Sequence, residues 1–226
     1  MAKPLLLVGN QNYSSWSLRP YMALAMADIA FDKKMIRMLV PGFRAKMAKY
    51  KTAGKLPLLI HNDITIWDTL AIIEYAAETW PAKNIWPRNK KARAMARAVS
   101  AEMHSSFFAL RNACPMNLRR AQKPPPGGIS EAVQKDVDRV EALWTQCRKL
   151  HGKGGAFLFG KFCAADAMFA PVVARFETFA IPVKPATRSY MNAILATKAF
   201  QQWKTDAAAE PWVIAEDEVD LWQRFQ

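Results

Sequence analysis

Three serines, Ser14, Ser15 and Ser17, stand between a short apolar run and a segment with helical periodicity. The run Pro4–Val8 has the length and flanks of a buried strand, and apolar residues recur at helical spacing from Leu18 onward. A hydroxyl at such a junction lies beside the free N–H groups and the positive dipole end of a helix, where it can stabilise an anion. Serine also caps helices without any ligand, so this stretch alone favours a structural role.

Asp68 and Thr69 form a second polar pair at a predicted helix start, followed by apolar residues on one helix face. A carboxylate can bind an ammonium group, while a hydroxyl and free N–H groups can bind a carboxylate. Both residue types are also good N-caps. Capping and ligand binding are therefore compatible at this position.

Pro57 follows Gly54-Lys55-Leu56 and opens an apolar run that ends at Ile60. Because X-Pro bonds have only a small trans preference, a cis bond is accessible where a turn requires one. The alternative is that Pro57 merely marks the beginning of a strand.

A β-α-β-α-β-β-α order is predicted to position these residues, which indicates an α/β layer with a mixed four-stranded sheet. Its expected elements are a strand at Pro4–Val8, a helix from Leu18, a strand at Lys33–Leu39, a short helix at Phe43–Lys51, a hairpin of Gly54–Ile60 with Ile64–Trp67, and a helix from Asp68 to Trp80.

The rest of the chain is predicted to be helical, which divides it into an α/β domain at 1–81, a linker at 82–90 and an all-α domain at 91–226. The expected helices are Ala92–Ala113, Ser130–His151, Ala164–Phe179, Ala186–Leu195 and Lys198–Ala209. The acidic stretch Glu216–Gln226 has no placement from the sequence.

The formal net charge is +13, and most of the excess lies in the central third of the chain. Such a charge can attract nucleic acid, acidic lipid or a small polyanionic substrate. No zinc finger, RRM signature or basic leucine zipper accompanies it. We therefore expect no nucleic-acid partner, and we interpret most of the lysines as solvated helix faces.

Half of the residues are hydrophobic, which excludes a disordered chain. No apolar run approaches the roughly 20 residues of a membrane span, and the N-terminus lacks the features of a signal peptide. The three cysteines are widely spaced, without CxxC or paired histidines, so disulfides and zinc are not expected. We expect a cytoplasmic protein that binds neither metal nor membrane.

Four motifs together resemble a cytosolic glutathione transferase across nearly the whole chain. They are Ser14-Ser15-Trp16-Ser17, Gly54-Lys55-Leu56-Pro57, Trp67-Asp68-Thr69-Leu70-Ala71-Ile72, and Phe159-Gly160 through Ala165-Asp166. The serine junction is most similar to the zeta, maleylacetoacetate isomerase-like branch. The resemblance implies a thioredoxin-like first domain, a homodimer, a role in detoxification, and glutathione as co-substrate.

In this family a serine of the first loop keeps the glutathione sulfur ionised, which makes Ser14 or Ser15 the catalytic candidate. A hydroxyl that donates to sulfur lowers the thiol pKa from its free value of about 8.5. Trp16 stands where the zeta class typically carries cysteine. Thiolate transfer to a small electrophile and glutathione-assisted cis-trans isomerisation therefore both stay open, as does a non-catalytic protein that binds glutathione or hydrophobic ligands.

The resemblance also assigns the glutathione contacts. With a cis Leu56-Pro57 bond, the backbone of Leu56 pairs with the cysteinyl part of the peptide, and Lys55 lies beside it. Asp68 and Thr69 bind the γ-glutamyl ammonium and carboxylate, and Arg44 is assigned to the glycine carboxylate.

The electrophile pocket is expected to use Trp16 and the first long helix of the all-α domain. Its candidates are His104, Phe107 and Arg111, with Met103, Phe108, Asn117 and Arg119 nearby. Arg111 favours an acidic substrate, or it holds a helix in place. His104 is more often a structural histidine than a catalytic base. Asp166 matches the family's buried structural cap, with Cys163 at the usual serine or threonine position.

Overall fold

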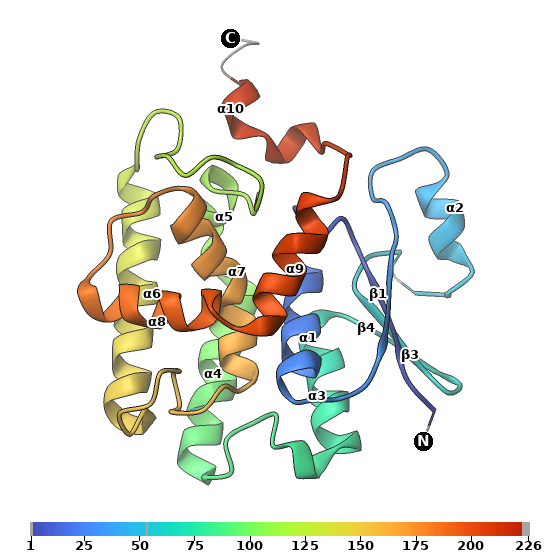
Figure 1. Cartoon of the computed structure of the whole chain (residues 1–226), viewed down its shortest axis with the longest axis horizontal. Helices are drawn as coiled ribbons and strands as arrows, with labels where there is room; N and C mark the ends of the chain where they lie inside the picture. The colour runs from blue at the N-terminus through green and yellow to red at the C-terminus, as the bar shows by residue number, and fades with distance from the viewer. Residues whose placement is uncertain (1, 53, 223–226) are drawn as a thin grey trace.

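A computed structural model describes residues 2–52 and 54–222 (Figure 1). Its first part is a thioredoxin-like layer in which the sheet order is β2-β1-β3-β4. Strand β1 pairs in parallel with β2 and antiparallel with β3, and β3 pairs antiparallel with β4. The predicted mixed four-stranded sheet is confirmed. Its elements are β1 (Leu5–Val8), α1 (Ser15–Met26), β2 (Asp32–Met35), α2 (Phe43–Ala48), β3 (Leu58–His61), β4 (Ile64–Trp67) and α3 (Thr69–Thr79).

The two faces of this sheet bury different sets of side chains, because successive residues of a strand point to opposite faces. Leu6 and Leu59 belong to the main core with α1 and α3, whereas Leu7 and Leu58 pack with Met47 of α2. Figure 1 accordingly shows α2 on the outer side of the sheet, and α1 and α3 on the side that faces the helices.

The second part of the described chain is helical, as predicted. Its elements are η1 (Pro81–Lys83), α4 (Lys90–Ser105), α5 (Phe108–Ala113), α6 (Glu131–His151), α7 (Ala164–Thr178), α8 (Pro185–Leu195), α9 (Lys198–Ala208), η2 (Ala215–Asp217) and α10 (Val219–Trp222). The predicted domain limits include residues 1, 53 and 223–226, which lie outside the described residues.

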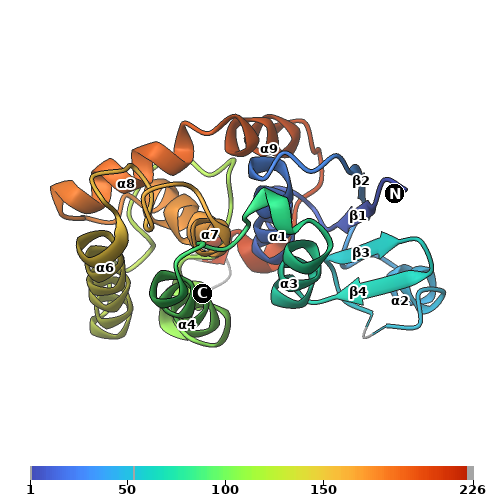
Figure 2. The ribbon, with the colours of Figure 1, turned by 90° about the horizontal axis from the view of Figure 1, so that it is seen from below.

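Helix α7 is the centre of the molecule, since every residue of it except Glu177 is buried. It packs against both α1 and α4. Figure 2 shows α1 and α3 lying between the sheet and the helical part, with α7 beside α1. The helix that carries the serine junction is therefore anchored in the core of both parts.

The predicted single helix Ala92–Ala113 is wrong, because the chain breaks it in two between α4 and α5. Ser106 is extended, and Phe107 adopts a left-handed conformation with φ of 64°. Left-handed backbone is unfavourable for a bulky residue. The Phe107 ring is only 4% exposed and belongs to the core, so its packing offsets that cost.

Asp166 begins the central helix as a buried structural cap. Its carboxylate accepts hydrogen bonds from the N–H groups of Cys163 at 2.9 Å and Leu158 at 3.0 Å. Burial raises the pKa of Asp166 to about 6, and these N–H groups act against that rise. Both bonds hold the connector before α7, which agrees with the structural role expected from the sequence.

Candidate functional site

The three serines lie where β1 runs into α1. Ser14 is the N-cap of α1, and its Oγ accepts from the Ser17 N–H at 3.4 Å. The Oγ atoms of Ser14 and Ser17 are 2.8 Å apart, and the Ser17 Oγ also accepts from the Gly9 N–H at 3.0 Å. Ser17 lies inside α1, and the cap is Ser14. The two hydroxyls thus form a short relay at a helix N-terminus.

Ser15 is the first residue of α1, and its side chain turns toward the helical part of the chain. Its Oγ accepts from Arg175 Nη2 of α7 at 3.4 Å. Arg175 is buried and also donates to the carbonyls of Cys114 at 2.9 Å and Pro171 at 3.3 Å. Burial lowers the pKa of Arg175 to about 10, with repulsion from Arg111 acting in the same direction.

Trp16 lies at the centre of a group of cations. The Arg19 guanidinium carbon is 4.7 Å from the Trp16 ring centroid, and that of Arg111 is 5.5 Å away. The His104 ring meets the Trp16 ring edge-on, with centroids 5.0 Å apart. The predicted pocket residues Trp16, His104 and Arg111 therefore do come together.

Arg19 is the most unusual charge at the site, because it is 1% exposed and its Nε and Nη1 have no hydrogen-bond partner among the described residues. Burial lowers its pKa well below the ordinary value. Repulsion from Arg111 and Arg175 adds to this effect, and attraction to Asp68 opposes it. This is a cluster of three guanidinium groups beside a helix N-terminus, an arrangement that favours negative charge nearby.

Arg111 contributes to the cluster from α5 while holding the end of α4. Its Nη2 donates to the carbonyl oxygens of Met103 and His104. Both interpretations made from the sequence, a pocket charge and a helix clamp, are thus compatible with its position.

Asp68 begins α3 as a cap, as expected. Its Oδ1 accepts from the N–H groups of Leu70 at 2.9 Å and Ala71 at 3.4 Å. Its Oδ2 lies 3.4 Å from His104 Nε2 of α4. The backbone at Asp68 has φ of 77° and ψ of 141°, a combination outside the left-handed helical region that costs a residue with a side chain about 1–3 kcal/mol and that is typical of functional sites. This carboxylate therefore links the α/β part to the helical part.

Thr69 is fully buried beside Asp68, and its Oγ1 donates to the carbonyl of Trp16 at 2.9 Å. That bond fixes the start of α3 against the start of α1. The two polar helix starts recognised in the sequence are thus neighbours in space.

The peptide bond between Leu56 and Pro57 is cis, as expected. Pro57 is buried, Leu56 is half-buried and Lys55 is exposed. Arg44 is exposed on α2, which packs on the opposite face of the sheet from α1 and α3. The structure brings neither Lys55 nor Arg44 into contact with the serines.

Phe107 and Phe108 diverge at the break between α4 and α5. Phe107 is buried in the core, whereas the side chain of Phe108 is 64% exposed. Arg111 lies near both Phe108 and Trp16. Its guanidinium carbon is 5.9 Å from the centroid of the Phe108 ring and 5.5 Å from that of the Trp16 ring.

The C-terminal segment, which the sequence could not place, binds the loop that carries the serines. Glu210 accepts from the backbone N–H groups of Gln11 at 2.7 Å and Asn12 at 3.5 Å. Tyr13 Oη donates to Glu218 Oε1 at 2.6 Å and accepts from Arg119 Nη2 at 3.0 Å. The segment from 210 to 218 therefore fixes the loop from outside.

Arg19 and Arg175 are site residues that were not predicted from the sequence. Each has a weak signal there, because it interrupts an otherwise apolar helix at a position where leucine or alanine neighbours predict burial. The contacts of Glu210 and Glu218 had no local signal, since they join residues about 200 positions apart.

Comparison with known proteins places this geometry in a family. A family model described as "Glutathione S-transferase, N-terminal domain" matches residues 13–79. A maleylacetoacetate isomerase of Rattus norvegicus is 28% identical over 205 residues, covering 88% of this chain and 91% of that protein. A maleylacetoacetate isomerase of Dictyostelium discoideum is 32% identical over 163 residues, covering 69% of each.

The chain belongs to the glutathione S-transferase family. This confirms the resemblance inferred from the motifs, including its direction toward the maleylacetoacetate isomerases, and the relatives are enzymes. Among solved structures, a glutathione transferase homolog from Burkholderia with bound glutathione has the same fold. Its TM-score is 0.69 at 22% identity, with 92% of this chain and all of that one covered.

None of the helices between residues 2 and 222 is long and apolar enough to cross a membrane. In the same residues, histidine, cysteine and acidic side chains form no group of three that could hold a metal ion.

Proposed function

We propose that the protein is a glutathione transferase of the zeta type, in which a serine hydroxyl stabilises the glutathione thiolate for attack on a small electrophile. The observation that supports this most directly is the pair of buried hydroxyls, Ser14 and Ser15, at the N-terminus of α1 beside three guanidinium groups. The thiolate rather than the thiol is the nucleophile, so a site that lowers the thiol pKa increases the reactive fraction at neutral pH.

Ser14 can donate to sulfur through the relay with Ser17. In the structure the Ser14 hydroxyl donates to the Ser17 Oγ, which also accepts from the Gly9 N–H, so the Ser17 proton is free. When glutathione binds, the Ser14 proton would turn to the sulfur, and the Ser17 hydroxyl would donate to the Ser14 Oγ in its place. Ser15 is the alternative donor, because the bond from Arg175 uses only an acceptor position of its hydroxyl.

The γ-glutamyl end of glutathione fits the start of α3 in this proposal. Asp68 would bind the ammonium group with the oxygen that now faces His104, while its other oxygen keeps the cap. The backbone N–H of Thr69, which neither the Asp68 cap nor the first helical hydrogen bond uses, would bind the carboxylate, while the Thr69 hydroxyl stays on the Trp16 carbonyl. Leu56, beside cis-Pro57, would pair with the cysteinyl backbone, and Lys55 and Arg44 would approach the glycine end.

The electrophile would lie against Trp16 and meet His104, Arg111 and the exposed ring of Phe108. Phe107, the aromatic candidate from the sequence, is buried in the core instead. Because the cluster of guanidinium groups is not neutralised by an adjacent ion pair among the described residues, we assign an acidic electrophile to it. The reaction is then either thiolate addition or substitution, or cis-trans isomerisation of an acidic substrate through reversible thiolate addition.

Single and double alanine variants of Ser14 and Ser15 test the mechanism. Losing one hydrogen bond to a charged sulfur costs about 1.5–3 kcal/mol, which raises the bound thiol pKa by about one to two units. The pKa is read from thiolate ultraviolet absorbance, and kcat/KM with a generic aromatic electrophile is followed in parallel. Ser17→Ala is expected to give a smaller rise. Ser189→Ala, in an exposed position on α8, is the matched control.

A double variant with an unchanged thiol pKa would contradict the proposed catalytic serines. Saturable glutathione binding without turnover of any electrophile would instead identify the non-catalytic binding protein. The family resemblance also supports a cytoplasmic homodimer that uses no metal, and sedimentation of the purified protein tests the oligomeric state.

A further inference from the structure

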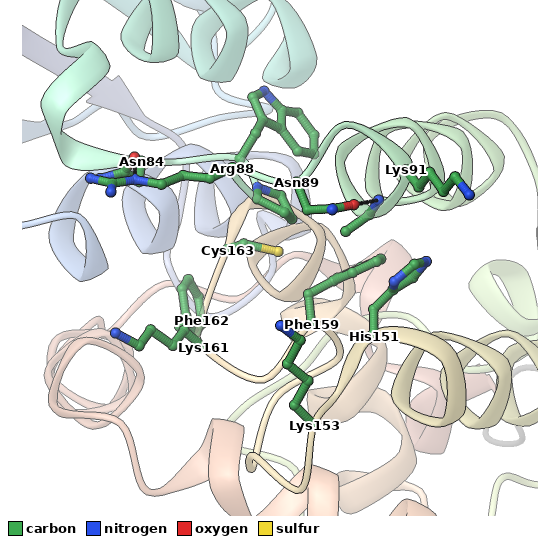
Figure 3. A pocket seen from close by; sticks show the side chains of 13 residues that line it. Asn84, Arg88, Asn89, Lys91, His151, Lys153, Phe159, Lys161, Phe162 and Cys163 are labelled. Atoms are coloured by element: carbon green, nitrogen blue, oxygen red, sulfur yellow. Dashed lines mark hydrogen bonds between the residues drawn. The ribbon is translucent and has the colours of Figure 1, made fainter.

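A cavity of about 620 Å³ lies between the segment that leads into α4 and the connector that joins α6 to α7 (Figure 3). It is remote from the serines. Lys91 lines it at the beginning of α4, whereas His104 meets Trp16 near the end of the same helix. Thirteen residues at about 1.5 Å each separate these positions by roughly 20 Å. The cavity is therefore a separate site and not an extension of the proposed catalytic one.

We call this cavity the basic pocket, because its lining has positively charged side chains and no negatively charged ones. Arg88, Lys91, Lys153 and Lys161 line it, and its lining contains no aspartate or glutamate. In residues 2–52 and 54–222 the three lysines form no ion pair and no side-chain hydrogen bond. The pocket thus offers three unpaired ammonium groups, enough for a ligand that carries at least two negative charges.

Arg88 plays a different part from the lysines. Its Nε donates to Asn84 Oδ1 at 2.6 Å, and Figure 3 shows the side chain extending away from the cavity toward Asn84. Lys153 extends toward the cavity beside Phe159, while the side chains of Lys91 and Lys161 extend outward at opposite ends of it. One ammonium group thus points to the space, and two more flank it from other segments of the chain.

The wall of the basic pocket is aromatic. The rings of His151 and Phe159 are stacked, with centroids 5.7 Å apart and planes 20° from parallel. Trp86 and Phe162 also line the space, with the buried residues Ala92 and Cys163 behind them. Flat faces of this kind stack on planar rings, which a simple inorganic anion does not offer.

Helix α4 adds to the positive potential. Asn89 caps it by accepting from the Ala92 N–H at 3.0 Å, and its first turn has no acidic residue. Both Asn89 and the first-turn residue Lys91 line the pocket, so the positive end of a helix of 16 residues is directed at this region.

We propose that the basic pocket binds a planar aromatic compound with at least two negative charges, of the chemical class of the nucleoside phosphates. The ring stacks on the His151–Phe159 wall, and the phosphate groups lie beside Lys153, where the flanking charges of Lys91 and Lys161 add to the positive potential. A half-open cleft of this volume matches one small molecule. It does not match the extended basic stripe that a nucleic acid would need.

Calorimetry on the full-length protein saturated with glutathione tests the pocket, with ATP and naphthyl phosphate as probes. We expect saturable binding of both, and binding of ATP at least tenfold tighter than that of adenosine or inorganic triphosphate. Since an exposed ion pair contributes about 0.2–1 kcal/mol, the combined variant Lys91→Ala, Lys153→Ala and Lys161→Ala is expected to weaken ATP binding by roughly tenfold. Lys204→Ala, an exposed lysine of α9, is the control.

The ring contact is tested separately by Phe159→Leu, which keeps apolar volume but removes the stacking face. It is expected to weaken ATP and leave triphosphate unchanged. The proposal is overturned if neither aromatic probe saturates, if triphosphate binds as tightly as ATP, if glutathione displaces ATP, or if the control weakens ATP as much as the triple variant. Glutathione-transfer rates measured on the triple variant are expected to be unchanged, so the two sites are judged independently.

Discussion

Arg19 is a positive charge held inside the protein with two of its nitrogens unpaired among the described residues. Burying a charge without an ion-pair partner opposes folding, and replacing buried charges by apolar groups often stabilises a protein by about 1–4 kcal/mol. The contact of Arg19 with the Trp16 ring offsets only part of that cost, and such a residue is expected at a functional site, where stability is commonly exchanged for activity.

We therefore predict that Arg19→Met has opposite effects on stability and activity. The free energy of unfolding in urea should rise by about 1 kcal/mol or more, because a desolvated charge is removed. The kcat/KM of glutathione transfer should fall about tenfold, because the positive potential at the α1 N-terminus is weakened. A fall in both quantities would show that Arg19 acts mainly in packing. Arg97→Met, which removes an exposed ion pair with Glu74, is the control.

The start of α3 shows at the scale of an element how a cap and a ligand site share one residue. One Asp68 oxygen accepts from two backbone N–H groups, and the other faces His104. Asparagine caps helices as well as aspartate does and has nearly the same size and shape, but it has no charge. The two roles of Asp68 can therefore be separated by substitution.

Asp68→Asn is predicted to keep stability within about 0.5 kcal/mol of the parent while weakening glutathione binding about tenfold, since a charged contact to the ammonium is lost. Asp68→Ala should lose the same affinity and in addition about 1 kcal/mol of stability. Urea unfolding and glutathione calorimetry on both variants measure these effects. If Asp68→Asn binds glutathione like the parent, the carboxylate does not hold the ammonium.

The elements that could be predicted from sequence are those that local chemistry determines. The strand at Leu5–Val8, the hairpin and the cap at Asp68 follow from apolar runs and from a carboxylate side chain at a helix start. Which of the three serines caps α1 did not follow from the sequence, because all three hydroxyls stand close to the helix start. The break at Phe107 has no such signal, because its left-handed backbone is stabilised by a buried ring whose neighbours are distant in sequence.

The same distinction holds for the candidate site. The sequence pointed to four of the candidate residues because a helix start has a local signal, namely polar side chains directly before an apolar periodic segment. These four are Ser14, Ser15, Asp68 and Thr69. Arg175 reaches Ser15 across 160 positions, and no periodicity indicates such a contact. The partners of the serine loop at Glu210 and Glu218 were beyond prediction for the same reason.

At the scale of the whole molecule, the C-terminal segment packs on the loop that carries the serines, and several of its carboxylates are charged or partly buried there. Asp220 pairs with Arg120 at 3.0 Å and Lys123 at 3.3 Å. Asp217 is half-buried, and burial raises its pKa to about 6, with attraction to Arg175 acting against that rise. The segment thus has one carboxylate that is favoured when ionised and another that is favoured when protonated.

The stability that Asp217 contributes should depend on pH in a defined direction. Its pKa is raised in the folded state, so between about pH 4 and pH 6 the folded protein binds more protons than the unfolded chain does. Stability attributable to Asp217 is therefore present below that window and is lost as the pH rises through about 6. The pKa of Asp166 is also raised to about 6, so this residue adds a pH dependence in the same direction. The parent and the variant must therefore both keep Asp166.

Asp217→Asn isolates this contribution because it leaves Asp166 in place and keeps the size of the side chain. A shift of about two units corresponds to about 3 kcal/mol, which we reduce to about 1 kcal/mol because solvent reaches the carboxylate. Between about pH 4 and about pH 7 the parent should lose that amount of unfolding free energy and Asp217→Asn should not. In urea unfolding the variant is therefore expected to be about 1 kcal/mol more stable relative to the parent at about pH 7 than at about pH 4. A difference between the two proteins that does not change with pH would mean that Asp217 stays ionised in the folded state, and that its attraction to Arg175 outweighs its burial.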